Sequence, residues 1–286
     1  MIAPAVPQKR RVWLRLLAVL ILLFAAFIAK GYWNATRDPI IRTGTIMVAD
    51  WPKNTGALKV LHLSDIHVAG PNMPPERLAQ IVRQLNALKP DLIVIAGDLI
   101  SESGPVTRAY PVNEVIAPLG QLRAPLGVVV APGNHDHWFD AKAITAELKK
   151  QGITVLQNAA VRRGPIIIGG IDDDYSGHDD TPATFAAMAA LGAGPRILVT
   201  HSPDIVPDLP QPVAAVFAGH THCGQLVFPI IGVLKSVSRY GDRFTCGLMN
   251  DNGQRVVVGA GLGTSILPLR YGAPPDAWMI TLKGSR

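Results

Sequence analysis

Apolar and polar residues alternate along this chain with two different periods. The runs "VLHL" at residues 60–63 and "LIVIA" at residues 92–96 are short and apolar, as buried strands are. Between them, residues 75–89 place leucine, isoleucine and valine on one stripe at helical spacing, which predicts an amphipathic helix. This order predicts a βαβ unit with two parallel strands and a right-handed crossover.

The same alternation continues towards the C-terminus. A helix around residues 112–122 and a strand at residues 127–130 repeat the unit. Asp140 is placed to cap another helix, and Thr181-Pro182 opens a short alanine-rich one. Further strands are expected at residues 153–156, 166–168, 197–200, 213–217, 255–258 and 278–282. So many strands exceed one modest open sheet, and the predicted fold class is α/β with two packed β-sheets flanked by helices.

The N-terminal part contains an unbroken apolar run at residues 16–29, "LLAVLILLFAAFIA". Fourteen residues are short for a membrane span, but the uncharged stretch extends to Trp33 if Lys30 reaches the interface. Trp13 before the run and Trp33 after it suit the two bilayer interfaces. The sequence therefore predicts contact with the cytoplasmic membrane through residues 16–33.

The basic residues are distributed unevenly along the chain. The net charge is +6, and residues 1–43 hold seven basic side chains against Asp38 alone, whereas the rest is balanced. The globular part therefore shows no basic footprint, and no specific nucleic-acid binding is expected. The cluster "QKRRVWLR" before the apolar run marks the cytoplasmic side. Everything after residue 37 is then expected to face the periplasm or exterior of the cell inner membrane.

This pattern divides the chain into an N-terminal segment at residues 1–37 and a domain at residues 38–286. The segment reads as a retained membrane anchor or a cleaved signal peptide. Ala29-Lys30-Gly31 has small residues at the separation of a cleavage site, but no clear A-x-A site follows the run, so the anchor is preferred. Arg10-Arg11 resembles a twin-arginine export signal or simply supplies positive charge. Residues 34–54 read as a linker.

The chain has two cysteines, Cys223 and Cys246. Two thiols cannot form a four-thiolate zinc site. The sequence does not decide whether these two cysteines form a disulfide in an oxidising compartment. Cys223 follows His222 directly and is expected to be a small packing group and not a metal ligand.

Each of five apolar runs ends in a polar cluster. The clusters are Asp65-Ile66-His67, Gly97-Asp98, Gly133-Asn134-His135-Asp136, Thr200-His201 and Gly219-His220-Thr221-His222. Carboxyl ends of strands share one edge of an α/β sheet, so the clusters should converge. Their nitrogen and oxygen donors suit Mn, Fe, Zn or Ni. The donors are too many for one ion, which predicts two divalent transition-metal ions that share a carboxylate.

In this order the blocks D-x-H, GD, GNHD, H and GHTH resemble the calcineurin-like metallophosphoesterases over residues 59–283. The stretches "GHTHCGQLVFP" and "GLGTSILPLRYGAPPDAW" resemble the bacterial branch that contains the YkuE- and YaeI-type phosphodiesterases. The resemblance implies a four-layer α/β/β/α fold with two mixed sheets. It also implies roles for the clustered residues.

By this resemblance, three residues bind the first ion, one bridges and three bind the second. The first set is Asp65, His67 and His222, the bridge is Asp98, and the second set is Asn134, His201 and His220. His135 faces the substrate, stabilises the transition state and donates a proton to the leaving oxygen. Two divalent ions and two carboxylates carry a net +2, which attracts an anionic substrate.

Other polar residues receive different roles. Asp136 is expected to cap the loop, His137 to line the rim, and His62 to be structural because it points away from the ligand edge. The acidic stretch at residues 170–180 is either solvated or at the edge of the active site. Arg270 in "LPLRYG" is expected to contact substrate or to form a structural ion pair.

The resemblance implies hydrolysis of a phosphoester substrate, either a diester or a monoester, by a hydroxide between two metal ions. The basic cluster before the apolar run places this activity at the outer side of the membrane. One alternative is a lipid-linked pyrophosphatase of the UDP-diacylglucosamine type. A cytoplasmic nucleotide-sugar substrate would conflict with the outward topology. The other alternative is a metal-binding module without catalysis. His135 argues against it, because metal binding does not need this residue.

Overall fold

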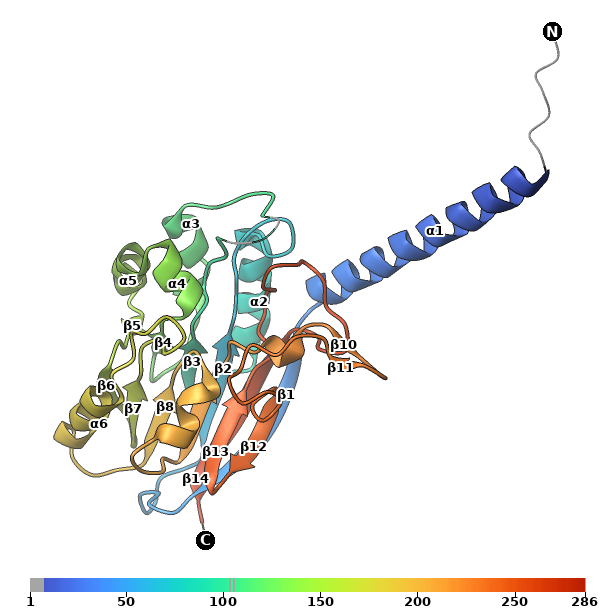
Figure 1. The fold of residues 1–286 in the computed structure, drawn as a ribbon. Helices are drawn as coiled ribbons and strands as arrows, with labels where there is room; N and C mark the ends of the chain where they lie inside the picture. The colour runs from blue at the N-terminus through green and yellow to red at the C-terminus, as the bar shows by residue number, and fades with distance from the viewer. Residues whose placement is uncertain (1–7, 103, 105, 286) are drawn as a thin grey trace.

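The structure is a computed structural model that describes residues 8–102, 104 and 106–285. Two six-stranded sheets form its centre (Figure 1). The first sheet has the order β1 (Ile40–Val48), β14 (Asp276–Gly284), β2 (Leu58–Ser64), β3 (Leu92–Ala96), β4 (Val128–Ala131) and β5 (Thr154–Val155). β2, β3, β4 and β5 are parallel, whereas β14 runs antiparallel to β2. The predicted βαβ unit is therefore present.

The second sheet has the order β12 (Gly247–Asp251), β13 (Gln254–Val258), β9 (Ala215–Ala218), β8 (Arg196–Val199), β7 (Ile166–Gly170) and β6 (Ala159–Arg163). β13, β9, β8 and β7 are parallel, and antiparallel strands close both edges. The helices are α1 (Gln8–Thr36), α2 (Pro75–Ala87), α3 (Val112–Ile116), α4 (Asn134–Phe139), α5 (Ala141–Lys150) and α6 (Thr181–Ala190). The 3-10 turns are η1 (Leu119–Gln121), η2 (Pro203–Asp208) and η3 (His222–Gly224). A small hairpin joins β10 (Val227–Phe228) to β11 (Gly232–Val233).

The side chains of each strand alternate between two cores. In β3, Ile93 and Ile95 pack against α2, α3 and α5, whereas Leu92 and Val94 face the second sheet. In β9, Phe217 lies between the sheets and Val216 packs on the side of α6. The result is helices, sheet, sheet and helix in four layers, and this confirms the predicted fold class.

The sequence prediction was wrong about residues 34–54 and 112–122, and it missed the strands β6, β10, β11 and β12. Residues 34–54 are not a linker, because β1 pairs in parallel with β14 along nine residues. The signal is weak since β1 is an edge strand with several half-exposed positions. The helix expected at residues 112–122 is divided into α3 and η1, and Pro118, which lacks an N–H donor, lies between them.

α1 projects from the domain and is long and apolar enough to cross a membrane over Lys9–Thr36 (Figure 1). Its apolar central part is exposed. Its last turns are not free of the domain, because Gly31 and Ala35 are buried. The main-chain N–H of Arg270 donates to the carbonyl of Gly31 at 3.0 Å, and Asn34 Nδ2 donates to the carbonyl of Arg270 at 3.0 Å.

Candidate metal centre

The carboxyl ends of five parallel strands bring the predicted ligands to one edge, where the two sheets meet. Asp65 and His67 follow β2, and Asp98 follows β3. Asn134 and His135 open α4 directly after β4. His201 follows β8, and His220 and His222 follow β9. All eight side chains are buried, as the clustering at strand ends predicts.

The backbone of this edge is unusual. Five of the seven predicted ligands have left-handed φ angles: Asp65, His67, Asp98, His220 and His222, with φ between 46° and 65°. Residues other than glycine rarely adopt this conformation, and it concentrates at functional sites. At Gly133 a Cβ atom would lie 2.3 Å from Asp98 Oδ1, so only glycine allows the third strand end to pass this close to the carboxylate.

One group of donor atoms faces a common point. The Nε2 atoms of His67 and His222 are 3.1 Å apart. His222 Nε2 lies 3.4 Å from Asp65 Oδ1, and His67 Nε2 lies 3.5 Å from Asp98 Oδ2. Asp65, His67 and His222 form a set of donors that can hold one ion, and it is the set predicted for the first metal.

A second group adjoins it through Asp98. His201 Nε2 is 3.1 Å from Asp98 Oδ2 and 3.1 Å from His220 Nδ1. Asn134 Oδ1 is buried and has no hydrogen-bond partner in the described part of the chain. A buried amide oxygen without a donor is costly, and a bound cation would satisfy it. The residues present therefore fit two oxygen- and nitrogen-ligated ions, with Asp98 between the two groups, although the ligand assignment itself stays a prediction.

Burial is the main cause of the pKa shifts of most ionisable side chains at this edge. It lowers the pKa of His67 and of His220 to about 3 and raises the pKa of Asp65 to about 6. Burial also acts to raise the pKa of Asp98, but the nearby His201 outweighs it and keeps this pKa below its usual range. His67 and His220 are thus neutral, which is the form of imidazole that binds metal. His201 differs, because burial acts to lower its pKa but the charge of Asp98 outweighs burial and raises the pKa of His201 well above its usual value.

His135 differs from the predicted histidine ligands because a carboxylate outside both donor groups, that of Glu102, holds its second ring nitrogen. Its Nδ1 lies 2.7 Å from Glu102 Oε2, and its Nε2 lies 4.0 Å from Asp98 Oδ2. Burial lowers the pKa of His135, but the Glu102 hydrogen bond and the charge of Asp98 raise it above its usual value. The sequence analysis did not assign Glu102, which follows the GD block by four positions and has no motif of its own.

Two neighbouring polar residues, Asp136 and His62, take structural roles, as expected. Asp136 accepts hydrogen bonds from the N–H groups of Asp98, Leu99 and Gly133 at 2.8–3.0 Å and so caps the loop. His62 Nε2 bonds to the Ala218 carbonyl at 2.9 Å, away from the ligands.

His137 is held by the acidic stretch. It bonds to Asp172 at 2.6 Å and stacks on His178. The acidic stretch at residues 170–180 also supplies Tyr175 to the cavity beside the ligands, so it lies at the edge of the site.

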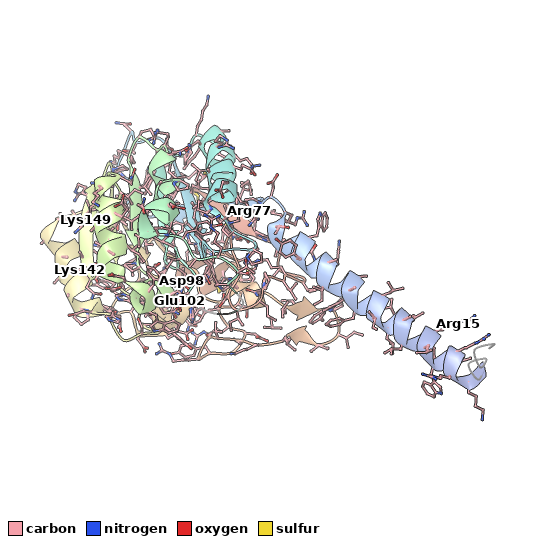
Figure 2. All side chains as sticks on the ribbon, turned by 90° about the horizontal axis from the view of Figure 1, so that it is seen from above. Arg15, Arg77, Asp98, Glu102, Lys142 and Lys149 are labelled. Carbon is pink, nitrogen blue, oxygen red and sulfur yellow. A yellow bond between two sulfur atoms is a disulfide. The ribbon has the colours of Figure 1, made fainter. Side chains whose placement is uncertain are left out.

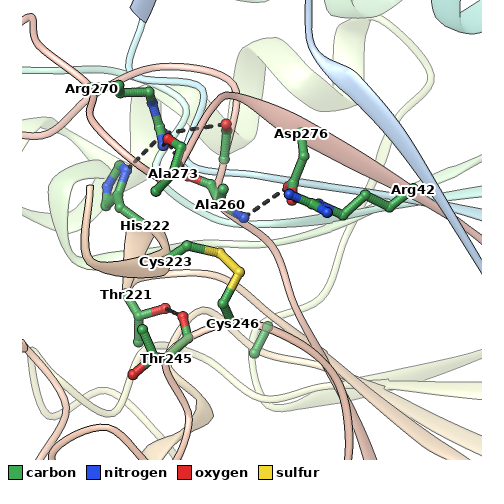
Figure 3. The surroundings of a disulfide bond; sticks show 12 residues. Arg42, Thr221, His222, Cys223, Thr245, Cys246, Ala260, Arg270, Ala273 and Asp276 are labelled. Atoms are coloured by element: carbon green, nitrogen blue, oxygen red, sulfur yellow. Dashed lines mark hydrogen bonds and ion pairs between the residues drawn. A yellow bond between two sulfur atoms is a disulfide. The ribbon is translucent and has the colours of Figure 1, made fainter. Parts of the chain in front are cut away.

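The structure corrects the expectation that Arg270 contacts substrate or forms an ion pair. Arg270 is fully buried and donates to the main-chain carbonyls of Ala260, Gly263 and Ala273 (Figure 3). Its Nη2 also lies 3.4 Å from His222 Nδ1. Arg270 therefore holds the loop under a predicted ligand, and its donors are used inside the protein.

The two cysteines are bonded to each other. Cys223 and Cys246 form a disulfide that joins the loop of His222 to the start of β12 (Figure 3). Thr221 Oγ1 donates to the Thr245 carbonyl at 2.8 Å beside it. The ligand-bearing loop is therefore fixed on one side by the disulfide and on the other by Arg270.

A cavity of about 350 Å³ opens over the ligands. Its floor contains Asp98, Asn134 and His135, and its walls contain Trp138 and Tyr175. On the far side the wall is apolar, with Leu226, Leu234, Ile266 and Leu267. The cavity can therefore bring a charged group to the metal ligands while an apolar group lies along the wall.

Comparison with known proteins finds a family match and several similar proteins. Residues 58–224 match the calcineurin-like phosphoesterase profile. The chain is 32% identical over 284 residues to a transmembrane protein with metallophosphoesterase domain from Danio rerio, covering 93% of this chain and 62% of that protein. It is 31% identical over 265 residues to the metallophosphoesterase YkuE of Bacillus subtilis (strain 168), covering 89% and 90%.

A second Bacillus subtilis (strain 168) protein, the metallophosphoesterase YkoQ, is 26% identical over 270 residues and is covered over 96% of its length. The chain spans less than two thirds of the Danio rerio relative but nearly all of both Bacillus relatives. These matches confirm the resemblance that the five sequence blocks indicated.

Proposed function

The chain belongs to the calcineurin-like phosphoesterase family, and from this premise we propose that it hydrolyses phosphoester bonds with two divalent metal ions. The observation that carries the proposal is the pair of donor groups that share Asp98, beside His135, which Glu102 holds. His201 and His67 approach the same Asp98 oxygen at 3.1 and 3.5 Å. Bound there, the ions would supply positive charge for the phosphoryl oxygens and activate a water molecule.

The other steps of the proposed hydrolysis are carried out by side chains of this protein. His135 lines the cavity, and Glu102 holds its Nδ1, so its Nε2 is the nitrogen that can reach a substrate. A protonated His135 donates a hydrogen bond to the phosphoryl group and then its proton to the leaving oxygen. Glu102 does not touch the substrate but orients the ring and favours its protonated form.

We place this activity outside the cytoplasmic membrane, with α1 as a retained anchor. The disulfide supports an oxidising compartment. Burial of Gly31 and Ala35 against the domain supports retention, because cleavage after Gly31 would remove one of these contacts. A C-terminal alkaline phosphatase fusion should be active in cells, and an inactive, well-expressed fusion would contradict export by the general route.

The test of the function uses the purified full chain, with Mn, Fe, Zn or Ni returned singly after chelation. We expect two ions per chain by elemental analysis and hydrolysis of a nitrophenyl diester, a nitrophenyl monoester or a nucleoside diphosphate. His135→Ala should keep both ions but lose roughly 10²–10⁴-fold in rate, as removal of a general acid does. The matched variant Asp98→Ala should lose the ions and the activity together.

Three results would contradict the proposal. Active protein with one ion or none would exclude the two-ion site. His135→Ala protein that retains metal and full activity would exclude the role of this residue, and a site that binds two ions but hydrolyses none of the three substrates would favour a binding module.

A further inference from the structure

The β10–β11 hairpin carries the most exposed large apolar side chains of the described domain. Its strands pair through Val227 with Val233 and Phe228 with Gly232. At the tip, Ile230 is 99% exposed and Ile231 is 70% exposed. Two adjacent isoleucines in water on a projecting hairpin have no role in folding, and exposed apolar patches mark interaction surfaces.

The hairpin lies beside the membrane helix and not elsewhere on the domain (Figure 1). Phe27 of α1 stacks on Tyr271, with ring centroids 4.6 Å apart, and Phe228 of the hairpin completes the aromatic group at 6.3 Å from Phe27. The Tyr271 hydroxyl donates to the Phe27 carbonyl. The N–H of Val227 donates to the Tyr271 carbonyl at 2.9 Å, so the helix, Tyr271 and the hairpin form one unit.

The position of Phe27 along α1 gives the depth of this unit. Phe27 belongs to the apolar run at residues 16–29, and Trp33 marks the interface in the proposed topology. Six residues of helix separate them, a rise of about 9 Å. The root of the hairpin therefore lies at the level of the lipid chains in the outer leaflet. The tip projects from this root away from the domain, on the side of α1 (Figure 1).

The hairpin also forms the apolar wall of the cavity. Leu226 and Leu234 stand at its base and are joined by a hydrogen bond of 3.0 Å. The loop of Ile266 and Leu267 is tied to the base, because Gln225 Nε2 donates to the carbonyls of Ser265 and Leu267 at 2.9 and 3.0 Å. Ile266 is 55% exposed and has a φ of 59°, which is strained for a β-branched residue.

From this geometry we propose that the β10–β11 hairpin inserts into the outer leaflet beside α1, and that the cavity receives amphiphilic phosphoesters from the bilayer. The inference rests on the proposed function and deepens it by naming a substrate class. The apolar wall holds the acyl part, and the polar floor receives the phosphoester. Lys235, which also lines the cavity, lies on the hairpin side and can pair with an anionic lipid headgroup.

Insertion is tested by depth-dependent quenching in the full chain. Ile230→Cys is labelled with a polarity-sensitive fluorophore, and the native cysteines do not react because they are joined. Lys149→Cys is the matched control, since Lys149 is exposed at the end of the molecule away from Arg15 (Figure 2). The chains are placed singly in discs of phosphatidylcholine and phosphatidylglycerol with ordinary or brominated acyl chains.

We expect a blue-shifted label at position 230 that brominated lipid quenches, and neither effect at position 149. Labels that behave alike would overturn the insertion. A blue-shifted label that brominated lipid does not quench would mean that a second copy or another protein covers the hairpin, and this also overturns it.

Delivery of substrate from the bilayer is tested by comparing the rate of hydrolysis of a lipid substrate with that of a soluble substrate. The variant Ile230→Ser with Ile231→Ser changes the tip but leaves the cavity lining intact. Its hydrolysis of a long-chain phosphodiester in vesicles should fall roughly tenfold, whereas hydrolysis of a soluble nitrophenyl diester should be unchanged. The matched control, Lys142→Ser with Lys149→Ser on α5, should change neither rate.

The quenching experiment and the rate experiment distinguish a failure of this inference from a failure of the proposed function on which it rests. The proposed substrate class is wrong if the rate on the long-chain phosphodiester, divided by the rate on the soluble nitrophenyl diester, is the same in the hairpin variant and in the wild type. Quenching does not depend on catalysis. Protein that hydrolyses no phosphoester but shows a quenched label therefore overturns the proposed function and leaves the membrane contact standing.

Discussion

Two neighbouring regions of the molecule differ in composition and in backbone conformation. One is the core between the two sheets, and the other is the ligand edge, which comprises the strand-end loops that carry the seven predicted metal ligands. Between the sheets, Val94, Phe217 and their neighbours are fully buried, apolar and in extended backbone. A few residues further along, the chain buries carboxylates and imidazoles and adopts left-handed φ angles. The core stabilises the fold, and the ligand edge uses part of that stability to hold donors around ions.

The difference implies that the ligand edge is destabilising until cations bind. Asp65 is fully buried, and burial raises its pKa to about 6. Its carboxylate accepts only the His220 N–H among the main-chain groups close to it in the described chain, at 2.9 Å. A metal ion would supply the missing positive charge. Substitutions in the two regions should therefore separate activity from stability.

The largest effect is expected for Asp65→Asn. The asparagine oxygen can still accept the His220 N–H, but the variant loses the negative charge that the first ion requires. We expect loss of that ion and a fall in activity of at least about 10⁴-fold. The free energy of unfolding without metal should not fall. Elemental analysis and chemical unfolding of chelator-treated protein measure both, and a large loss of metal-free stability would mean that Asp65 is a structural residue.

The converse variant is Phe217→Ala in β9. Phe217 is fully buried between the sheets, so the cavity left behind should cost about 3–5 kcal/mol of unfolding free energy. The protein that remains folded should still bind two ions and keep its rate per folded chain. The milder Phe217→Leu serves as a control. Loss of metal from folded Phe217→Ala protein would show that the core and the ligand edge are not separable.

The two regions also differed in how far the sequence predicted them. Long apolar runs such as β3 were predicted to the residue, because periodicity and burial agree there. The edge strand β1 was missed because its first three positions are all half-buried, and exposed and buried residues alternate clearly only from Thr45 to Val48. The short hairpin strands β10 and β11 have two residues each, too few for a period to appear.

At the ligand edge, motifs identified the residues but not all of their partners. The predicted donors lie together because strand ends meet at one edge. Glu102 and Arg270 could not be assigned from spacing: both act through distant segments, with Glu102 on His135 33 positions away and Arg270 on His222 48 positions away. Such contacts depend on loop conformation and not on local pattern.

Glu102→Gln sharpens the comparison within the site. The glutamine can still bond His135 Nδ1, but its neutral amide no longer favours the protonated ring. We expect kcat to fall about tenfold with an alkyl ester, KM to stay unchanged, and the deficit to shrink with nitrophenyl esters, whose leaving group needs little protonation. Metal content should not change. A change in KM alone would mean that Glu102 contacts substrate and does not orient His135.

The smallest effect concerns His62, which belongs to the core although it precedes the predicted ligand Asp65 by three positions. Its ring lies 5.5 Å from that of Phe217, its Nε2–H donates to the Ala218 carbonyl, and its Nδ1 has no partner within residues 8–102, 104 and 106–285. Protonation would bury an unpaired N–H and a charge, so burial lowers the pKa of His62 from 6.5 to about 4.

The sign of the pH dependence follows from this shift. Between pH 6.5 and 4 the unfolded chain binds the proton more readily than the folded one, so the stability is complete above pH 6.5 and is lost as the pH falls. From pH 7.5 to 5.5 the loss due to His62 should be about 1.3 kcal/mol. His62→Gln, which keeps a donor for Ala218, should lack this part of the loss when chelator-treated full-length proteins are unfolded at both pH values. Other groups titrate equally in both proteins and cancel in the difference. Equal losses in the two proteins would mean that His62 is already solvated or charged in the folded state, and that the core extends less far towards the ligand edge than its packing indicates.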